Sequence, residues 1–169
     1  DYLSKFSFFY YEFLLCTDLP VDAKKYLLKN ISSFEMSASY INHPYTVSKR
    51  IISLVILSCF RQSDVTDTQL QLEINNRLSE DISFLTQNIE YHIDGNHILT
   101  NFLALALVYK ITREQTLEQF EKKYLKEFEE QFGRDVHYER SYSYSKQLLY
   151  EFILYYQLCS KEEQIEYSG

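Results

Sequence analysis

Residues 91–109, YHIDGNHILTNFLALALVY, decide the fold of this chain. The second half of the stretch is almost entirely apolar, so it lacks the polar face that a surface helix turns towards water. It therefore predicts a helix over about 95–110 that is buried nearly all round. The helix opens with the polar sequence DGNH, and the question is whether Asn96 and His97 only begin a helix or carry chemistry.

The composition predicts an all-α protein. Glycine (3) and proline (2) are too scarce among the 169 residues for the many turns of an all-β fold. Hydrophobic residues make up 46% of the chain, enough to form the core of an ordinary globular domain. Tyrosine (16) and phenylalanine (12) are abundant and tryptophan is absent, so we expect the aromatic packing to come from rings that are often only partly buried.

Hydrophobic positions recur at spacings of three and four along most of the chain, which is the period of a helix packed on one face. The pattern predicts helices over residues 2–16, 21–31, 46–61, 66–91, 95–110, 112–132 and 143–160. Thr112 and Gln115 have the spacing of a capping box at the start of the sixth helix, and Gly133 has the position of its C-cap.

Helices that follow one another through short loops form antiparallel hairpins. No repeat of about 34 residues is visible, which disfavours a tetratricopeptide-type solenoid. Nearly all-apolar helices alternate with amphipathic ones, as the inner and outer helices of a ring do. We therefore expect an incomplete α/α toroid built from antiparallel helical hairpins, in a single helical domain over residues 1–169.

Charge and cysteine content exclude several classes of function. The formal net charge of −7 disfavours nucleic acid as a partner, because phosphate binding takes clustered Lys and Arg. The apolar N-terminal run is interrupted by Glu12 and has no small-residue cleavage site, so we expect neither a signal peptide nor a membrane span there. Cys16, Cys59 and Cys159 are widely spaced and odd in number, and they predict buried thiols without disulfides or a zinc site.

Three polar clusters interrupt the helical pattern, each at the start of a predicted helix: NHPYTVSKR at 42–50, DGNH at 94–97 and HYERSYSYSK at 137–146. A helix start presents unpaired N–H groups and a partial positive charge. Three such helix starts that converge on one opening would bind an anion. His92 and His97 lie five residues apart and would not share a helix face, so we expect neither a metal site nor a cofactor.

The three clusters resemble, in order and with similar intervals, the helical-domain motifs of the heparinase II/III family of polysaccharide lyases. The family typically reads H-P-Y-P-V-S-x-R, then G-N-H-L-L-x-N-x-x-A-L, then D-G-x-x-x-E-x-S-P-x-Y-H, where this chain has NHPYTVSKRI, GNHILTNFLALALVY and HYERSYSYSKQLLYEFI. The resemblance spans about residues 40–155. It implies an α/α toroid followed by a β-sandwich domain in a longer chain, and a bacterial enzyme that is periplasmic or secreted.

The resemblance also implies a reaction. The family cleaves uronate-containing polysaccharides by β-elimination, in which the C5 proton is removed and the 4-linked sugar is expelled. The carbanion can form only if the charge of the uronate carboxylate is neutralised. By resemblance, Asn96 neutralises this carboxylate with His97 beside it, and Tyr144 transfers the proton. The implied partner is an anionic, uronate-containing polysaccharide.

In such a lyase, further residues of the same motifs would contact the sugar acid: Arg140, Tyr142, His43, Tyr45 and Arg50. Arginine suits this role because its guanidinium matches a carboxylate or a sulfate. The alternative roles are structural. Arg140 would then form a surface ion pair with Glu139, and the residues of the first cluster would fix a loop to a helix.

Three positions depart from the family pattern. Thr46 stands where the first motif has its second Pro, Tyr142 stands for the Pro of the third motif, and Ser145 for its final His. The doubled SYSY leaves open whether Tyr142 or Tyr144 is the functional ring, and we select Tyr144. The family's other catalytic His and Tyr belong to later helices and to the β-sandwich.

These departures keep other interpretations open. The first is a non-catalytic helical domain that binds a polysaccharide or a protein partner. The second is a helical scaffold in which Asn96 and His97 form an ordinary polar first turn capped by Asp94. In either case Asn101, which is out of phase with Asn96 on the helix, is expected to be a structural hydrogen-bonding residue.

Overall fold

The computed structural model of the chain describes four stretches, residues 43–60, 68–93, 95–132 and 142–166. Helices account for 88% of these residues and none of them is in a strand, which confirms the all-α class. The contacts divide the chain into two compact units, residues 1–89 and 90–169. The helices predicted at 2–16 and 21–31 and the C-cap predicted at Gly133 lie outside the described residues.

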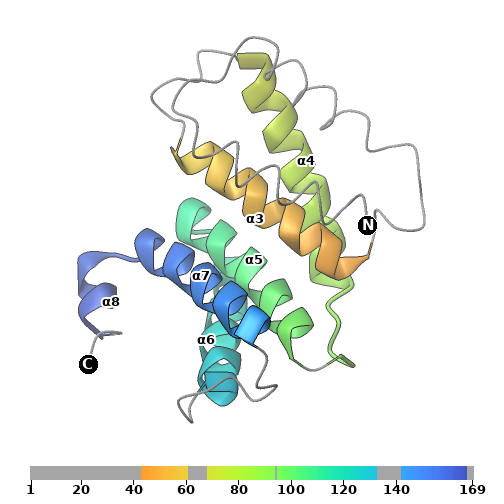
Figure 1. Cartoon of the computed structure of the whole chain (residues 1–169). Helices are drawn as coiled ribbons and strands as arrows, with labels where there is room; N and C mark the ends of the chain where they lie inside the picture. Colours follow the sequence, from red (N-terminus) through yellow and green to blue (C-terminus); the bar gives the residue numbers. More distant parts are fainter. Residues whose placement is uncertain (1–42, 61–67, 94, 133–141, 167–169) are drawn as a thin grey trace. The chain divides into compact units, whose positions relative to one another are not determined.

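The described part of the first unit is an antiparallel hairpin of α3 (Pro44–Phe60) and α4 (Thr68–Gln87) (Figure 1). α3 is buried along most of its length, as its apolar run predicts. Near its start, Arg50 forms a bidentate pair with Asp81 near the end of α4, with both N–O distances at 2.6 Å. Both side chains are buried, so this pair fixes the register of the hairpin.

The second unit contains α5 (Asn96–Thr112), the 3-10 turn η2 (Gln115–Leu117), α6 (Glu118–Phe132), α7 (Tyr142–Leu158) and α8 (Lys161–Glu166). α6 and α7 both pack against α5. Every residue of α5 from Ile98 to Val108 is buried, which confirms the helix predicted to be covered nearly all round. Within the described stretches, no helix is long and apolar enough to cross a membrane.

The order of contacts along α5 and α6 shows that these helices are antiparallel. The Gln131 side chain, at the end of α6, donates a hydrogen bond to the carbonyl of Gly95, just before α5 (3.0 Å). At the other end of the pair, the Lys110 ammonium lies 2.5 Å from the carboxylate of Glu121, near the start of α6. The predicted hairpin is therefore confirmed for this pair.

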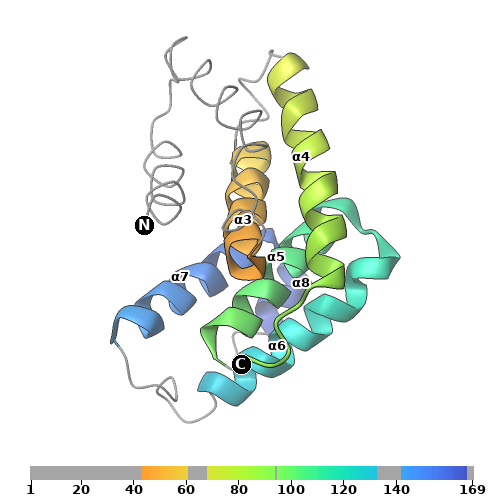
Figure 2. The same cartoon turned by 90° about the vertical axis from the view of Figure 1, so that its right-hand side faces the viewer.

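α5 and α7 run in the same general direction. The Thr100 hydroxyl donates to the Glu151 carboxylate (3.4 Å), and further along both helices the Lys110 ammonium lies 5.3 Å from the centre of the Tyr155 ring. The two views agree with this order (Figures 1 and 2). The starts of α5 and α7 therefore lie at the same end of the second unit, while closure of these helices into a toroid stays a prediction.

Tyrosine and phenylalanine rings fill the space between α6 and α7. Phe128 stacks on Phe152 with ring centres 4.3 Å apart and on Phe132 at 4.6 Å. Tyr124, which is fully buried, meets Tyr155 edge to face at 5.1 Å. Such ring pairs stabilise a helix interface beyond the area that they bury, which explains how this chain forms a core without tryptophan.

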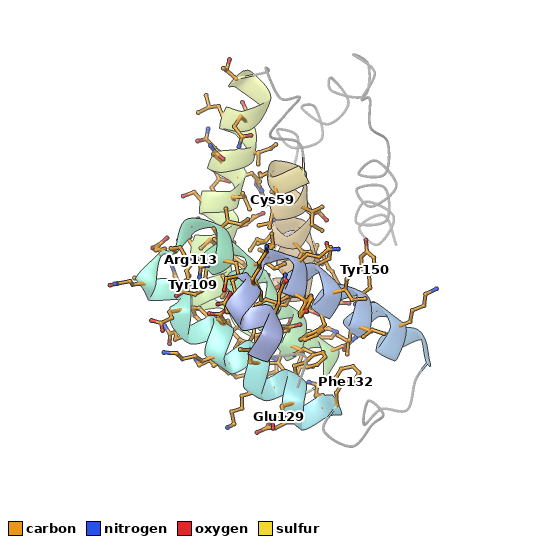
Figure 3. All side chains as sticks on the ribbon, turned by 90° about the vertical axis from the view of Figure 1, so that its left-hand side faces the viewer. Cys59, Tyr109, Arg113, Glu129, Phe132 and Tyr150 are labelled. Carbon is orange, nitrogen blue, oxygen red and sulfur yellow. The ribbon has the colours of Figure 1, made fainter. Side chains whose placement is uncertain are left out.

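The capping box predicted at Thr112 is wrong. Thr112 is the last residue of α5, and its hydroxyl donates back to the Val108 carbonyl (3.0 Å) and accepts from the N–H of Glu114 (3.3 Å). Threonine can satisfy its hydroxyl inside its own helix, which competes with capping the next one. Arg113 then ends α5 in the left-handed conformation (φ 56°), with its guanidinium over the Tyr109 ring (Figure 3).

Candidate functional site

α5 begins on a backbone conformation that glycine alone adopts without strain. Gly95 has φ 87° and ψ −144°, a region that a β-carbon makes unfavourable. Among the described residues, no side chain caps the helix at this position, and Asp94, the expected cap, lies outside them. The N–H groups at a helix start carry a partial positive charge. The glycine of the GNH sequence thus allows the turn that begins α5 at this positive end.

Asn96 is the first residue of α5 and is half-buried. Its amide forms no hydrogen bond with any residue of the described stretches. An amide has both donors and acceptors, and it carries no charge and no tendency to act as a base. At the positive end of a helix, such a group is suited to bind a carboxylate.

His97, the next residue, is oriented by a buried carboxylate. Its Nδ1 lies 3.3 Å from Oε1 of Glu90, whose side chain is 3% exposed, whereas the His97 side chain is 31% exposed. This contact fixes the orientation of the imidazole ring at the start of α5.

Asn101 holds Glu90 in place for this contact. The backbone N–H of Glu90 donates to Oδ1 of Asn101 (3.0 Å), and Nδ2 of Asn101 donates to Oε2 of Glu90 (3.5 Å). Asn101 is completely buried, and the two bonds use both ends of its amide. The structural role predicted for Asn101 is confirmed, and Glu90 is a contributor to the site that the sequence did not reveal.

The other predicted half of the site begins α7. Tyr142 and Tyr144 belong to the first turn of this helix, but their side chains are not described, and Arg140 lies outside the described residues. The start of α7 lies at the same end of the second unit as Asn96. The choice between the two tyrosines stays a prediction.

The residues of the first polar cluster belong to the other unit. His43 is exposed directly before α3, and Tyr45 is half-buried with the Lys49 ammonium 5.3 Å from its ring centre. Arg50 is buried and paired with Asp81 within the α3–α4 hairpin. This pairing gives Arg50 a structural role, and substrate contacts by these three residues stay predictions.

A buried ammonium group joins four helices of the second unit. The Lys110 side chain on α5 has no exposed surface, and its Nζ lies 2.5 Å from Glu121 on α6 and from Glu163 on α8. The Tyr155 hydroxyl on α7 donates to Glu121 (2.6 Å). Burial lowers the pKa of Lys110, but the hydrogen bonds to the two carboxylates outweigh it and the net pKa is raised. Lys110 therefore stays charged. A charged ammonium suits a structural ion pair between helices and cannot act as a nucleophilic amine.

α8 starts with a capping box that the sequence analysis missed. The Ser160 N–H donates to the Glu163 carboxylate (2.7 Å), and the Glu163 N–H donates to the Ser160 hydroxyl (3.3 Å). The S-x-x-E spacing of residues 160–163 was the available signal. Glu163 thus caps α8 and pairs with Lys110 at once.

The thiols in the described stretches are not activated. Cys159 is buried and Cys59 half-buried, and neither forms a disulfide. Burial raises the pKa of both thiols above its ordinary value, which keeps the reactive thiolate scarce. The described residues also contain no group of three or more His, Cys, Asp or Glu side chains that could hold a metal ion.

The start of α5 is therefore the candidate site: there the Asn96 amide, which forms no hydrogen bond with a described residue, lies beside an imidazole oriented by Glu90. No family model, curated protein or solved structure matches this chain. The function has to be inferred from the motifs and from the geometry of the second unit.

Proposed function

We propose that this chain is the helical part of a polysaccharide lyase that resembles the heparinase II/III family and cleaves uronate-containing polymers by β-elimination. The observation that carries the proposal is the start of α5, where the Asn96 amide, which has no hydrogen-bond partner within the described stretches, adjoins His97, whose ring is held by Glu90. The G-N-H-x-L-x-N-x-x-A-L element that begins at this position is also the most specific part of the family resemblance.

The difficult step is removal of the C5 proton of the uronate, because the negative charge that develops must spread onto a carboxylate that is already charged. A neutral amide donor at the positive end of a helix offsets this charge without competing for the proton. Asn96 has this role in the proposal. His97 stands beside it, and its ring is the second proposed contact to the sugar.

The C5 proton passes to a base, its electron pair forms the C4–C5 double bond, and the C4–O bond breaks. The leaving oxygen then takes up a proton. Tyr144 is the proposed proton-transfer residue, because a tyrosinate can accept the first proton and the neutral phenol can supply the second. The position of the α7 start, at the same end of the second unit as Asn96, supports this assignment.

The test uses the natural full-length protein and a panel of uronate polymers that includes heparan sulfate, hyaluronan and alginate. A lyase leaves an unsaturated uronate on each new chain end, which absorbs in the ultraviolet, so absorbance should grow with time on at least one polymer. Binding of a polymer without any new absorbance across the panel would contradict the lyase and leave the non-catalytic binding domain.

A further inference from the structure

A second polar feature lies beside the candidate site, where the Lys123 ammonium on α6 rests among three aromatic rings. Its Nζ lies 5.3 Å from the ring centre of Tyr91, 5.2 Å from that of Phe120 and 5.8 Å from that of Phe102. It also donates a hydrogen bond to the Tyr91 hydroxyl (3.0 Å). These distances are within the range of cation–π attraction, so the ammonium is held in a defined place.

Lys123 differs from its neighbours on α6 in its charge balance. Lys122 pairs with Glu118 four residues before it, and Lys126 pairs with Glu130 four residues after it. Lys123 forms no ion pair with any described residue. The carboxylate four residues on, Glu127, instead accepts a hydrogen bond from Gln131 (2.8 Å). The positive charge of Lys123 is therefore positioned but not neutralised within the described stretches.

Tyr91 adds an open aromatic surface to this charge. The residue is 58% exposed, although its ring contacts the buried ring of Phe102 at 6.0 Å. Phe120, also buried, lies behind the ammonium and stacks on Phe102 at 6.5 Å. The two buried phenylalanine rings thus pack behind the exposed Tyr91 ring and the Lys123 ammonium.

We propose that Tyr91 and Lys123 form a subsite for one acidic sugar of the polymer. A uronate sugar has two groups that complement these side chains: its carboxylate can pair with the Lys123 ammonium, and its apolar C–H face can pack on the Tyr91 ring. Charge-assisted hydrogen bonds are among the stronger contacts available at a surface. The inference rests on the proposed function in that the ligand is the same uronate polymer.

The position of the subsite suits a sugar next to the one that reacts. Glu90, which contacts His97, directly precedes Tyr91 in the chain. This adjacency places Tyr91 close to the carboxylate that orients His97, so the same polymer chain is expected to contact both places.

Three carboxylates near Lys123 along α6 have cationic partners: Glu118 pairs with Lys122, Glu121 with Lys110 and Glu130 with Lys126. Pairing lowers the repulsion that these three exert on an acidic ligand. Glu127 accepts its hydrogen bond from the neutral amide of Gln131 and keeps its negative charge.

The experiment is a calorimetric titration of the full chain with three tetrasaccharides, an unsulfated uronate one from hyaluronan, a sulfated one from heparin, and neutral chitotetraose. The variants are Lys123→Gln and Tyr91→Leu. The matched controls are Lys126→Gln, which removes the same charge one turn away, and Tyr150→Leu, an exposed tyrosine on α7. Far-UV circular dichroism establishes that each variant is folded.

We expect the chain to bind the hyaluronan tetrasaccharide more tightly than chitotetraose, and Lys123→Gln to weaken that binding about tenfold, the loss of one charge-assisted hydrogen bond. Tyr91→Leu should weaken both acidic ligands, and the two controls should bind like the wild type. Preference for the heparin tetrasaccharide alone would overturn the uronate assignment. Equal losses in Lys126→Gln and Lys123→Gln, or no binding of acidic sugars by the wild type, would overturn the subsite.

These outcomes are separate from those of the lyase test. Tetrasaccharide binding that depends on Lys123, together with no unsaturated product from any polymer, would reject the proposed reaction and keep the subsite. Unsaturated product formed at an unchanged KM by Lys123→Gln would reject the subsite and keep the reaction.

Discussion

Replacing Lys110 by methionine tests how the second unit is held together. Methionine keeps most of the apolar stem but removes the ammonium that pairs with Glu121 and Glu163. Two charge-assisted hydrogen bonds are worth about 1.5–3 kcal/mol each, and removal of one member of a buried ion pair leaves uncompensated charge behind. Glu121 keeps the Tyr155 hydroxyl and Glu163 keeps the Ser160 N–H. We therefore expect a loss near the low end of the sum of the two bonds, about 3 kcal/mol in the free energy of unfolding.

Urea unfolding followed by far-UV circular dichroism measures this loss. Lys122→Met is the matched control, since Lys122 also pairs with a glutamate but is 72% exposed. Exposed pairs contribute little, so the control should change the free energy of unfolding far less than Lys110→Met does. Equal effects of the two substitutions would contradict the stabilising role of the buried ion pairs of Lys110.

The same variant has a defined pH dependence. Burial raises the pKa of Glu163, but hydrogen bonds from Lys110 and Ser160 outweigh it, so the net pKa lies below its ordinary value of 4.5. A carboxyl whose pKa is lowered in the folded state stabilises the protein above the unfolded pKa, and this contribution is lost as the pH falls through the folded pKa. The difference in stability between wild type and Lys110→Met should therefore be full above about pH 5 and shrink below pH 4.5. A difference that stays constant through this window would contradict the ion pair.

Three further substitutions test other parts of the account by urea unfolding. Gly95→Ala should cost about 1–3 kcal/mol, because alanine is strained at φ 87° and ψ −144°, and a neutral result would remove the backbone reason for glycine in GNH. Arg50→Met removes the bidentate partner of the buried Asp81 carboxylate but leaves the Arg77 guanidinium at 3.2 Å, so it should cost about 3 kcal/mol, the lower end for a broken buried pair. Arg50→Lys should restore only part of this loss, and full restoration by lysine would contradict the bidentate geometry. Asn101→Ala should cost about 1–3 kcal/mol because it removes the buried hydrogen bond that the backbone N–H of Glu90 donates, and a loss below about 0.5 kcal/mol would contradict the structural role of Asn101.

In the described stretches, the sequence pattern predicted the helices because the apolar residues of a helix face recur at spacings of three and four. The buried helix predicted at 95–110 is α5, two residues longer at its end because Thr112 bonds back to Val108. The Gly95 turn needs glycine for a backbone reason that acts within a single residue. Features of this kind depend on neighbours in sequence, and sequence reasoning can reach them.

Contacts between segments far apart in the chain could not be predicted from the sequence pattern. Lys110 and Glu163 are 53 residues apart in the chain, and nothing in the period of either helix indicates that they meet. The sequence pattern likewise places Glu90 at the end of a long amphipathic helix, whereas α4 ends at Gln87. The turn that follows brings the Glu90 carboxylate to His97. Such pairings depend on how helices pack, and a pattern read along one helix does not contain them.

The most direct test of the central claim is the rate at which the full-length protein forms unsaturated uronate when Asn96 is replaced by alanine. If the Asn96 amide neutralises the uronate carboxylate, its removal should lower kcat/KM by about 100-fold or more, as the loss of one preorganised donor does. Asn76→Ala, which removes an exposed amide on α4, should leave the rate unchanged. Product formation by Asn96→Ala at the wild-type rate would contradict the role assigned to the start of α5.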